Sequence, residues 1–363
     1  MTRDGMNYAP APGPATRVVE PGAFAFAAAY FDHGHIYGQI QGLAAAGATL
    51  KYIYEPDAAR HENVRRDHPQ AKVAASFEQI LDDPEVRLVT AAAIPQLRAG
   101  IGLKVMAAGK DYLTDKSPFT TLAQLEEVRG AVTRTGRKYM VCYSERLLSE
   151  SAYHAGVLIR QGAIGRVLQV LNLAPHNLAA KNRPAWFFRK EACGGIITDI
   201  GSHQFEQFLH YTGDADATID AARADNLGHP EYPEFEDFGE ALLTTASGAS
   251  CYCRVDWFNP AGSKTWGDGR TFVLGSDGYL EIRKMRDLCQ GAGDVIYLVD
   301  GKDEQRIECA GKVGQPFFGA FLLDCLHRTE AAMSQAHAFK AAELSMQAQA
   351  MADARRRGGV AVV

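Results

Sequence analysis

Apolar and polar positions in the first part of the chain follow a rhythm that predicts parallel strands joined by helices. Short, largely apolar runs typical of buried strands occur at Ala23–Phe31, Thr49–Tyr54, Val86–Ala93, Asp111–Thr114 and Tyr139–Tyr143. Between them lie segments with helical spacing, two of which open with capping boxes at Ser76 and Thr121. This alternation predicts a doubly wound parallel sheet.

Beyond about Glu145, strand-like segments follow one another without helices between them. They are Ala217–Ala224, Phe238–Thr245, Cys251–Phe258, Thr271–Leu274, Tyr279–Arg283 and Val295–Val299. Helices are expected before them, at 150–161 and 199–212, and after them, at 317–327 and 339–356. Consecutive strands favour a large, mostly antiparallel open sheet with helices on one face.

The expected fold class is therefore α/β, in three parts. Residues 1–22 are rich in proline and are expected to form an extended arm. Residues 23–145 form the doubly wound domain. Residues 146–363 form a second α/β domain, whose last helix can pack back on the first.

Composition excludes several classes of protein. The 363 residues carry 38 Lys and Arg against 43 Asp and Glu, a net charge of −5, with no long basic run to hold nucleic acid. The longest apolar stretch, 23–31, is about half of a membrane-spanning helix, and the first twenty residues lack a signal peptide's apolar core. The seven cysteines are scattered, which favours reduced thiols. We expect a cytoplasmic enzyme without nucleic-acid or membrane partners.

The turn after the first strand retains part of a dinucleotide fingerprint. The three positions of G-x-G-x-x-G fall on Asp32, Gly34 and Tyr37, so only the glycine at which the backbone approaches the pyrophosphate is kept. Glu55 follows Gly34 by 21 positions, where a carboxylate could hold ribose hydroxyls and repel a 2′-phosphate. The pattern favours NAD over NADP, although an ordinary strand-to-helix turn would look similar.

The histidines at 33 and 35 raise the question of a metal. With no cysteine or carboxylate at ligand spacing, such a pair is more often solvent-exposed or capping. We expect no metal.

Two motifs carry candidate catalytic chemistry. Lys116, within 115–118, follows a strand at the edge where open α/β sheets bind ligands, so its ammonium could hold a substrate oxygen. Asp199 and His203, four positions apart after a glycine pair at 194–195, share one face of a helix start. Histidine suits proton transfer near neutral pH, and a neighbouring carboxylate would orient it. Taken singly, Lys116 could be a surface loop lysine, and an Asp-x-x-x-His pair is more often a structural pair on a helix.

Together the motifs resemble the glucose-fructose oxidoreductase/inositol dehydrogenase (Gfo/Idh/MocA) family, over essentially the whole chain from about residue 23. The family's Gly-Gly-x-x-x-Asp-x-Gly-x-His helix start matches 194–203, and its Glu-Lys-Pro motif matches 115–118 with one inserted serine. Further matching segments are 108–110, 162–166 and 183–186.

The resemblance implies a Rossmann domain followed by an α/β domain whose open sheet often mediates homodimers or homotetramers. It implies an enzyme that transfers hydride between NAD, or NADP, and a hydroxyl/carbonyl pair of a sugar, cyclitol or related polyol. By matched position, Lys116 would anchor the reacting oxygen and the nicotinamide ribose. His203 would be the general base and acid, and Asp199 its partner and a substrate ligand.

The resemblance also places residues around both ligands. Cofactor contacts would come from Asp32, Gly34, His35, Ile36, Glu55, Ile94, Pro95, Arg98 and Lys116. Substrate contacts would come from Tyr143, Arg146, His176, Asn177, Arg183, Trp186 and Asp199. Arg98 replaces the histidine of the family's Thr-Pro-Asn-x-x-His segment, so the cofactor contacts depart from the family pattern there.

Other interpretations remain open. One is a sugar–sugar oxidoreductase, or a redox-assisted glycoside-cleaving enzyme, with tightly bound cofactor. Others are a non-catalytic dinucleotide or sugar sensor and a metal-dependent lyase or isomerase. In the loop at 259–270, Asp268-Gly269 favours a hairpin turn, whereas Trp266 could stack on a sugar or cover a neighbouring subunit's site.

Overall fold

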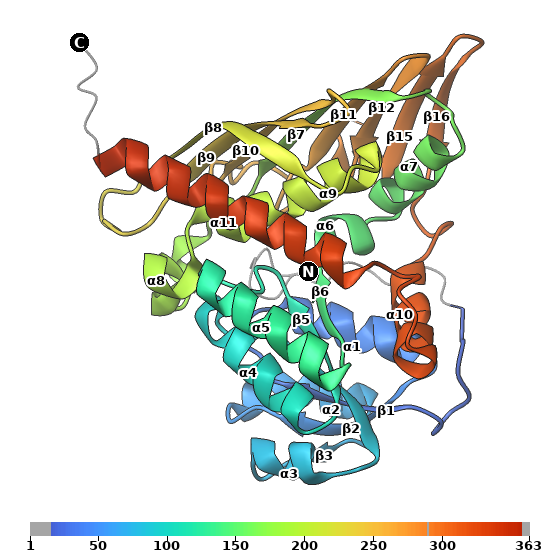
Figure 1. The fold of residues 1–363 in the computed structure, drawn as a ribbon, viewed down its shortest axis with the longest axis vertical. Coiled ribbons are helices and arrows are strands. Elements are labelled where there is room, and N and C mark those ends of the chain that lie inside the picture. Colours follow the sequence, from blue (N-terminus) through green and yellow to red (C-terminus); the bar gives the residue numbers. More distant parts are fainter. Residues whose placement is uncertain (1–15, 289, 358–363) are drawn as a thin grey trace.

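The structure, a computed structural model, describes residues 16–288 and 290–357 and has two parts stacked on one another (Figure 1). Of the expected arm, residues 1–15 lie outside the described residues. Among the described residues, no helix has both the length and the apolar character needed to cross a membrane.

The first part is a six-stranded parallel sheet with strand order β3-β2-β1-β4-β5-β6. Its strands are β1 (Ala25–Ala29), β2 (Thr49–Tyr54), β3 (Lys72–Val73), β4 (Val86–Ala91), β5 (Asp111–Asp115) and β6 (Tyr139–Cys142). The connecting helices are α1 (His35–Ala45), α2 (Ala58–Asp67), α3 (Phe77–Asp82), α4 (Pro95–Ala107) and α5 (Leu122–Thr135). Helices α4 and α5 cover one face and α1 the other (Figure 1). The expected doubly wound sheet is confirmed.

Local signals set the ends of these helices as expected. The Thr121 hydroxyl accepts from the Gln124 N–H, and the Gln124 side chain bonds the Thr121 N–H, completing a capping box. Gly136 ends the same helix at φ 61°, a conformation that suits glycine. At the start of α3 the Ser76 hydroxyl accepts from the Gln79 N–H, but the Gln79 side chain bonds the Ala75 N–H, so the capping box expected there is only half formed.

The second part is built on an eight-stranded sheet with order β16-β15-β12-β11-β7-β10-β9-β8. These strands are β7 (Val167–Pro175), β8 (Ala217–Asp225), β9 (Phe238–Thr245), β10 (Ser250–Asp256), β11 (Arg270–Gly275), β12 (Gly278–Arg283), β15 (Val295–Asp300) and β16 (Glu304–Glu308). Only the β7–β10 pair of this sheet is parallel. The mostly antiparallel sheet is therefore confirmed. A short pair, β13 (Arg286–Asp287) and β14 (Gly291–Ala292), stands apart.

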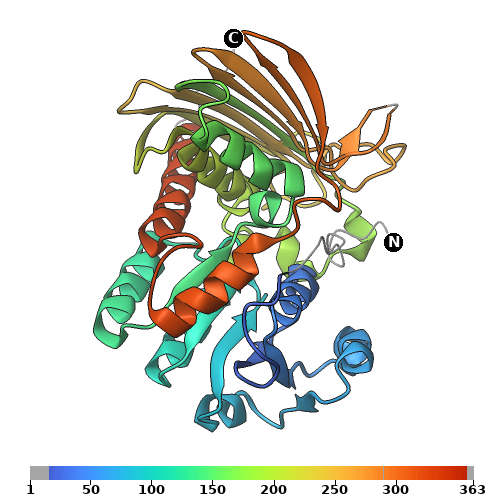
Figure 2. The ribbon, with the colours of Figure 1, turned by 90° about the vertical axis from the view of Figure 1, so that its right-hand side faces the viewer.

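Helices lie between this sheet and the first part (Figures 1 and 2). They are α6 (Ser144–Leu147), α7 (Glu150–Arg160), α8 (Lys190–Cys193), α9 (Ser202–Thr212) and α11 (Gln335–Arg357). Helix α10 (Pro316–His327) packs beside α1 on the first part. Single turns of 3₁₀ helix occur at Ala180–Asn182 and Ala185–Phe188, and a π-helical turn at Ile197–Gly201 leads into α9.

One sequence expectation about connectivity is wrong. Residues 259–270 do not form a hairpin, because β7 lies between β10 and β11 in the sheet. The segment is instead a long loop that crosses the end of β7, with Asn177 N bonded to Trp266 O.

Two hydrophobic cores form, and the C-terminal helices contribute to both. Phe317, Phe321 and Phe339 belong to the core of the parallel sheet. Ala348 and Ala352, further along α11, belong to the core of the large sheet. Helix α11 therefore ties the two parts together.

Candidate active site

Lys116 lies directly after β5, at the carboxyl edge of the parallel sheet, and meets a residue of the second part. Its Nζ bonds Asp199 Oδ1 at 2.8 Å, and both side chains are largely buried. Burial alone would raise the pKa of Asp199, but the Lys116 ammonium outweighs it and holds that pKa below its usual value. The two residues, 83 positions apart, form one buried ion pair between the domains.

Glycines bring Asp199 to this position. Gly194 and Gly195 have φ of 88° and 91°, the left-handed region that glycine tolerates. A Cβ on Gly195 would lie 2.5 Å from the Gln349 side chain on α11. Gln349 Oε1 in turn accepts from the Ile197 N–H at 3.0 Å, which fixes the start of the π-helical turn.

His203 follows in the first turn of α9 and is 3 % exposed. Burial lowers its pKa to about 3, with Glu145 acting in the opposite direction and Lys116 in the same one. The ring is therefore neutral near pH 7 and able to accept a proton. The expected pairing with Asp199 is wrong: Asp199 binds Lys116, and His203 Nδ1 has no hydrogen-bond partner among the described residues. Asp199 lies within the π-helical turn, and His203 lies in the first turn of α9.

Sequence reasoning missed a buried carboxylate beside His203. Glu145 Oε2 accepts from Lys284 Nζ and from Gln204 Nε2, each at 2.9 Å, and Glu145 Oε1 lies 3.7 Å from His176 Nε2. Burial alone would raise the pKa of Glu145, but Lys284 outweighs it and the pKa falls well below its usual value. No local signal marks Glu145, because its partner Lys284 is 139 positions away.

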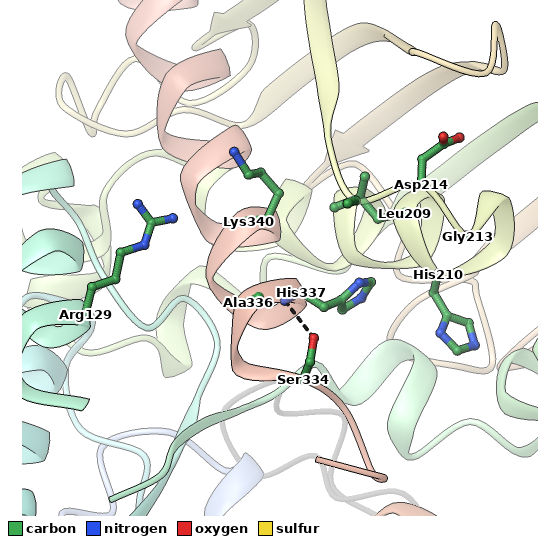
Figure 3. A pocket seen from close by; sticks show the side chains of 10 residues that line it. Arg129, Leu209, His210, Gly213, Asp214, Ser334, Ala336, His337 and Lys340 are labelled. Carbon is green, nitrogen blue, oxygen red and sulfur yellow. Dashed lines mark hydrogen bonds between the residues drawn. The ribbon is translucent and has the colours of Figure 1, made fainter. Parts of the chain in front are cut away.

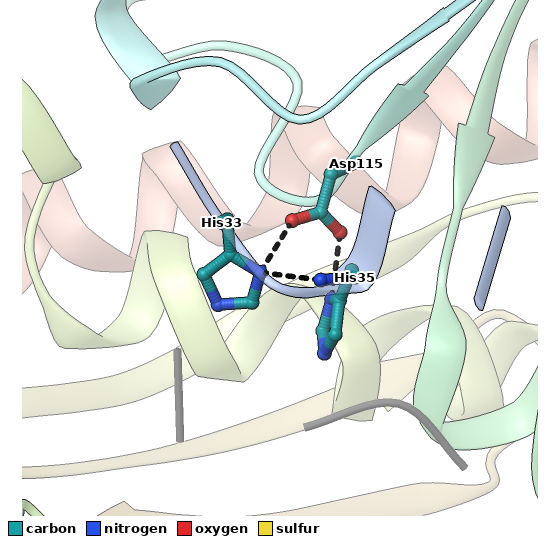
Figure 4. Close-up of side chains that lie close together, drawn as sticks. All are labelled: His33, His35 and Asp115. Atoms are coloured by element: carbon teal, nitrogen blue, oxygen red, sulfur yellow. Dashed lines mark hydrogen bonds and ion pairs between the residues drawn. The ribbon is translucent and has the colours of Figure 1, made fainter. Parts of the chain in front are cut away.

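A second hub forms around Asp115, which precedes Lys116. Its carboxylate contacts His35 Nδ1 at 2.8 Å and His33 Nδ1 at 3.1 Å (Figure 4). It also accepts from the Lys116 N–H at 2.8 Å and from Arg98 Nη2 at 3.3 Å. The expectation that the two histidines are solvent-exposed or capping groups is therefore wrong, since both are buried against Asp115.

Arg98 supports the lysine. The guanidinium is 1 % exposed, and it donates to Ala93 O at 2.6 Å and to the carbonyl of Lys116. With its donors directed at protein groups, Arg98 holds the backbone around Lys116 in place.

The first-strand edge has the features of a dinucleotide cradle. Gly34 precedes α1 at the sheet edge where phosphates bind in such folds, and the first N–H groups of the helix bond within the turn, His35 N–H to His33 Nδ1 and Ile36 N–H to His33 O, each at 3.3 Å. Glu55 ends β2 and accepts from the Phe31 and Asp57 N–H groups at 2.8 and 2.9 Å. Asp32 pairs with Arg60 at 3.1 Å. These residues fit a dinucleotide.

The remaining expected cofactor residues occupy the neighbouring helix starts. Ile36 lies in the first turn of α1, while Ile94 and Pro95 open α4. All three stand at the same edge of the parallel sheet as Lys116.

The expected substrate residues fall into two groups. Some lie near Lys116 and His203, and others bind parts of the protein away from them. His176 lies beside Glu145 and within electrostatic reach of Lys116; its Nδ1 is 2.9 Å from Ala174 O, and its ring centroid is 4.4 Å from that of Trp266. Arg183 packs over Trp257 and Trp266 at 4.9 and 5.8 Å. Burial, opposed by Glu145, lowers the pKa of His176 to about 4. Trp266 thus lies in this chain's own aromatic cluster.

Two expected substrate residues have structural partners in this neighbourhood. Asn177 bonds Asn259 O and the Ala179 N–H, which shapes the loop. Trp186 is half-buried against Phe187, with ring centroids 6.0 Å apart.

Tyr143 and Arg146 are placed differently from expectation. The Tyr143 hydroxyl donates to Ala338 O at 2.8 Å, leaving only the ring edge toward His203. Arg146 binds the buried Glu206, with its Nε 2.8 and 2.9 Å from the two carboxylate oxygens. Arg146 is therefore a structural partner of Glu206 and does not point to Lys116.

A pocket of about 460 Å³ lies away from Lys116, between α5, α9 and α11, and is lined by Arg129, His210, His337 and Lys340 (Figure 3). Next to it, Glu206, His210 and His337 bring possible ligand atoms within 4.8 Å of one another, as do His33, His35 and Asp115. In both groups a buried arginine already neutralises the carboxylate, through Arg146 and Arg98 respectively. This chemistry gives a dication little advantage at either place.

The fold and this edge define a class: a two-domain, dinucleotide-binding oxidoreductase. Residues 29–143 match the oxidoreductase family with the NAD-binding Rossmann fold, and residues 154–281 match the GFO/IDH/MocA C-terminal domain. The chain belongs to the Gfo/Idh/MocA family.

Solved structures and curated relatives agree with this family assignment. An oxidoreductase structure from Erwinia carotovora atroseptica is 47 % identical, with TM-score 0.87, covering 91 % of this chain and 98 % of that one. A levoglucosan dehydrogenase solved with NADH and levoglucosan shares the fold at TM-score 0.75 and 18 % identity, covering 92 % and 97 %.

Curated relatives match over shorter stretches. The D-xylose dehydrogenase of Paenarthrobacter nicotinovorans is 27 % identical over 40 % of this chain and 38 % of its own length. The levoglucosan dehydrogenase of Pseudarthrobacter phenanthrenivorans is 28 % identical over 59 % and 58 %. The chain thus matches less than two thirds of either relative.

Proposed function

We propose that the protein is an NAD(H)-dependent dehydrogenase or reductase acting on a hydroxyl/carbonyl pair of a sugar, cyclitol or related polyol. The observation that carries the proposal is the buried Lys116–Asp199 pair beside a neutral, buried His203, at the edge where the dinucleotide cradle lies. Relatives named as sugar and inositol dehydrogenases support the substrate class. NADP remains a candidate cofactor, since one relative is named an NADP(+)-dependent inositol dehydrogenase.

Different residues of the chain carry out different parts of the proposed reaction. The nicotinamide, when bound, supplies the hydride-exchanging carbon. His203 accepts the proton of the substrate hydroxyl, which its neutral state permits. The Lys116 ammonium, held by Asp199, stabilises negative charge as it develops on the reacting oxygen. Burial of these groups strengthens each interaction by excluding water.

Several other features belong to this proposal. Asp32, Gly34, His35, Ile36, Glu55, Ile94 and Pro95 form the cofactor edge. His176, Arg183 and Asp199, with Glu145 and Trp266 added, form the substrate side. The protein acts in the cytoplasm, needs no metal, and pairs as a homodimer or homotetramer through the outer face of its large sheet.

The test is a panel of sugars, cyclitols and their keto forms, followed by NADH absorbance and repeated with NADP and with a chelator. Lys116→Met and His203→Asn should each lower kcat by about 10²- to 10⁴-fold, because each removes a group that acts on the reacting oxygen. Binding of NADH should change by no more than a few fold.

Lys104→Met, at an exposed site on α4, is the matched control and should turn over normally. Near-normal turnover by both site variants would remove the catalytic assignment. A dinucleotide that leaves the protein only on denaturation would favour the sugar–sugar oxidoreductase alternative.

A further inference from the structure

The turn that carries Asp199 is held at its start by side chains from two distant segments. The Ile196 N–H donates to Glu236 Oε2 at 3.1 Å. The Ile197 N–H donates to Gln349 Oε1 at 3.0 Å. Glu236 comes from the loop before β9, and Gln349 comes from α11. Because the first N–H groups of a helical segment have no partner inside it, these two side chains take the place of a cap.

Glu236 and Gln349 also bind each other. A backbone N–H can only donate, so the end of Gln349 that faces Ile197 is the carbonyl oxygen and the other end is the NH₂ group. This Nε2 lies 3.2 and 3.0 Å from the two oxygens of Glu236, and 3.0 Å from Asp353 Oδ1. The contacts at both ends therefore agree on one orientation of the amide.

A lysine balances the charge of Glu236. The Glu236 side chain is 1 % exposed, and a carboxylate buried to this degree is costly unless it is paired. Lys190 Nζ binds both Glu236 and Asp353. Lys190 opens α8, which ends at Cys193, directly before the glycine pair. The network thus joins α8, the loop before β9 and α11 at the point where the chain enters the turn.

The turn has little support of its own. Gly194 and Gly195 adopt φ of 88° and 91° and have no side chains to restrain them. The π-helical turn that follows, Ile197–Gly201, is a rare conformation. Because the Asp199 N–H donates to Gly195 O at 2.9 Å, a shift of Gly195 moves Asp199 directly. Bonds from outside the turn are therefore what fix its position.

We propose that Glu236 is a positioning residue for Asp199, on which it acts through the Ile196 N–H and through Gln349. With the start of the turn fixed, Asp199 Oδ1 stays 2.8 Å from Lys116 Nζ. The expected effect of Glu236 on turnover rests on the proposed function, whereas its effect on the contact between Lys116 and Asp199 does not.

One substitution type, made at two places, isolates this role. Glu236→Met keeps the length of the side chain and removes both oxygens, so the Ile196 N–H loses its acceptor. Glu236→Gln keeps one oxygen for that N–H and should recover part of the loss. Glu150→Met is the matched control. Glu150, 5 % exposed and located on α7, accepts from the Lys312 and Val313 N–H groups at 2.9 and 3.0 Å, so the same kind of bond is lost away from the turn.

The first readout needs neither cofactor nor substrate. Trace labelling with acetic anhydride, quantified by peptide mass spectrometry, reports how freely Lys116 reacts. Lys110, which is similarly buried, is the reference for general opening in the same sample. In E236M the labelling of Lys116 relative to Lys110 should rise by about 3- to 10-fold, because Lys116 loses a charge-assisted bond to Asp199. The rise should be smaller in E236Q and absent in E150M.

The second readout is turnover of the best substrate from the panel of sugars and cyclitols. E236M should lower kcat by roughly 10- to 100-fold, because the pair that acts on the reacting oxygen is misplaced, and should leave NADH affinity unchanged. E236Q should fall between E236M and the wild type, and E150M should match the wild type.

Unchanged relative labelling of Lys116 in E236M, or an equal rise in E150M, would overturn the inference whatever the turnover. Raised labelling with a normal kcat would overturn the link to turnover. If E236M does not fold, Gln349→Met removes the acceptor of the Ile197 N–H instead and should give the same rise, and its absence would again overturn the inference. A wild-type protein that shows the labelling pattern but no dehydrogenase activity would overturn the proposed function alone.

Discussion

Burial controls what the histidines of the site can do. His33, His176 and His203 are each less than a tenth exposed, and burial is the main cause of their lowered pKa values, about 3, 4 and 3. Each ring is neutral at neutral pH, ready to accept a proton or a hydrogen bond. The same burial has a consequence for stability.

We predict that the protein loses stability as the pH falls below the unfolded pKa of histidine, about 6.5. The unfolded chain then binds three protons that the folded site excludes, so stability decreases with falling pH. From pH 7 to pH 5.5 the loss for these three residues is about 4 kcal/mol. Urea unfolding at the two pH values measures it, and a flat profile would contradict the prediction.

The candidate catalytic residues could be proposed individually from the sequence, but the partners that they have in the structure could not. Lys116, Asp199 and His203 lie in motifs that can be recognised in the sequence. The contacts of Lys284 with Glu145 and of Asp115 with His33 depend on which loops the fold brings together. The expected Asp199–His203 pairing fails because Asp199 binds Lys116, which is 83 positions away in the sequence and is brought to it by the fold.

At the scale of elements, the turn that carries Asp199 depends on Gly195 and on α11. Gly195 combines φ of 91° with a Cβ position 2.5 Å from Gln349. Gly213, at the end of α9, has φ of 77° but open space where a Cβ would lie. The two glycines therefore differ in packing alone.

Gly213→Ala is expected to cost about 1 kcal/mol of unfolding free energy, from backbone strain. Gly195→Ala should cost about 1–2 kcal/mol more, because Gln349 must also move, and it should lower kcat by displacing Asp199. Thermal unfolding together with steady-state kinetics tests both variants. Equal losses, with kcat unchanged in Gly195→Ala, would show that Gln349 does not fix the turn.

Elements whose apolar pattern matched their burial were predictable, whereas β7 and α2 are among those that were not. Strand β7 places Val170, Asn172 and Ala174 inward and leucines on the half-buried outer face, so its pattern resembles neither kind of strand. Helix α2 buries only His61 and Val64, which gives no amphipathic stripe. Strand β7 and helix α2 form because neighbouring elements supply hydrogen bonds and packing. These contributions cannot be predicted from the sequences of β7 and α2 alone.

At the scale of the whole molecule, the outer face of the large sheet is a candidate surface for self-association. Strand register aligns Leu242, Tyr252, Leu171 and Phe272 as neighbours across four strands. Leu242, Leu274 and Tyr279 on this face are 40 %, 37 % and 38 % exposed. A second copy covering such a row would remove it from water.

We predict that Leu242→Asp combined with Leu274→Asp converts the protein to a monomer, because two charges would be buried in the interface. Sedimentation velocity measures the change, with circular dichroism confirming the fold. Leu97→Asp, at a 46 % exposed site on α4, is the control and should leave the oligomer intact. An unchanged sedimentation coefficient in the double variant would place the interface elsewhere.

Helix α11 has a mechanical consequence for the working molecule. Phe339 packs on Phe119 and Tyr139 in one core, and nine residues later Ala348 lies in the other. Because helix α11 is packed into the cores of both domains, it resists rotation of one domain against the other far more than a loop would. Ligands are therefore expected to enter and leave past mobile side chains and loops at a nearly constant angle between the domains.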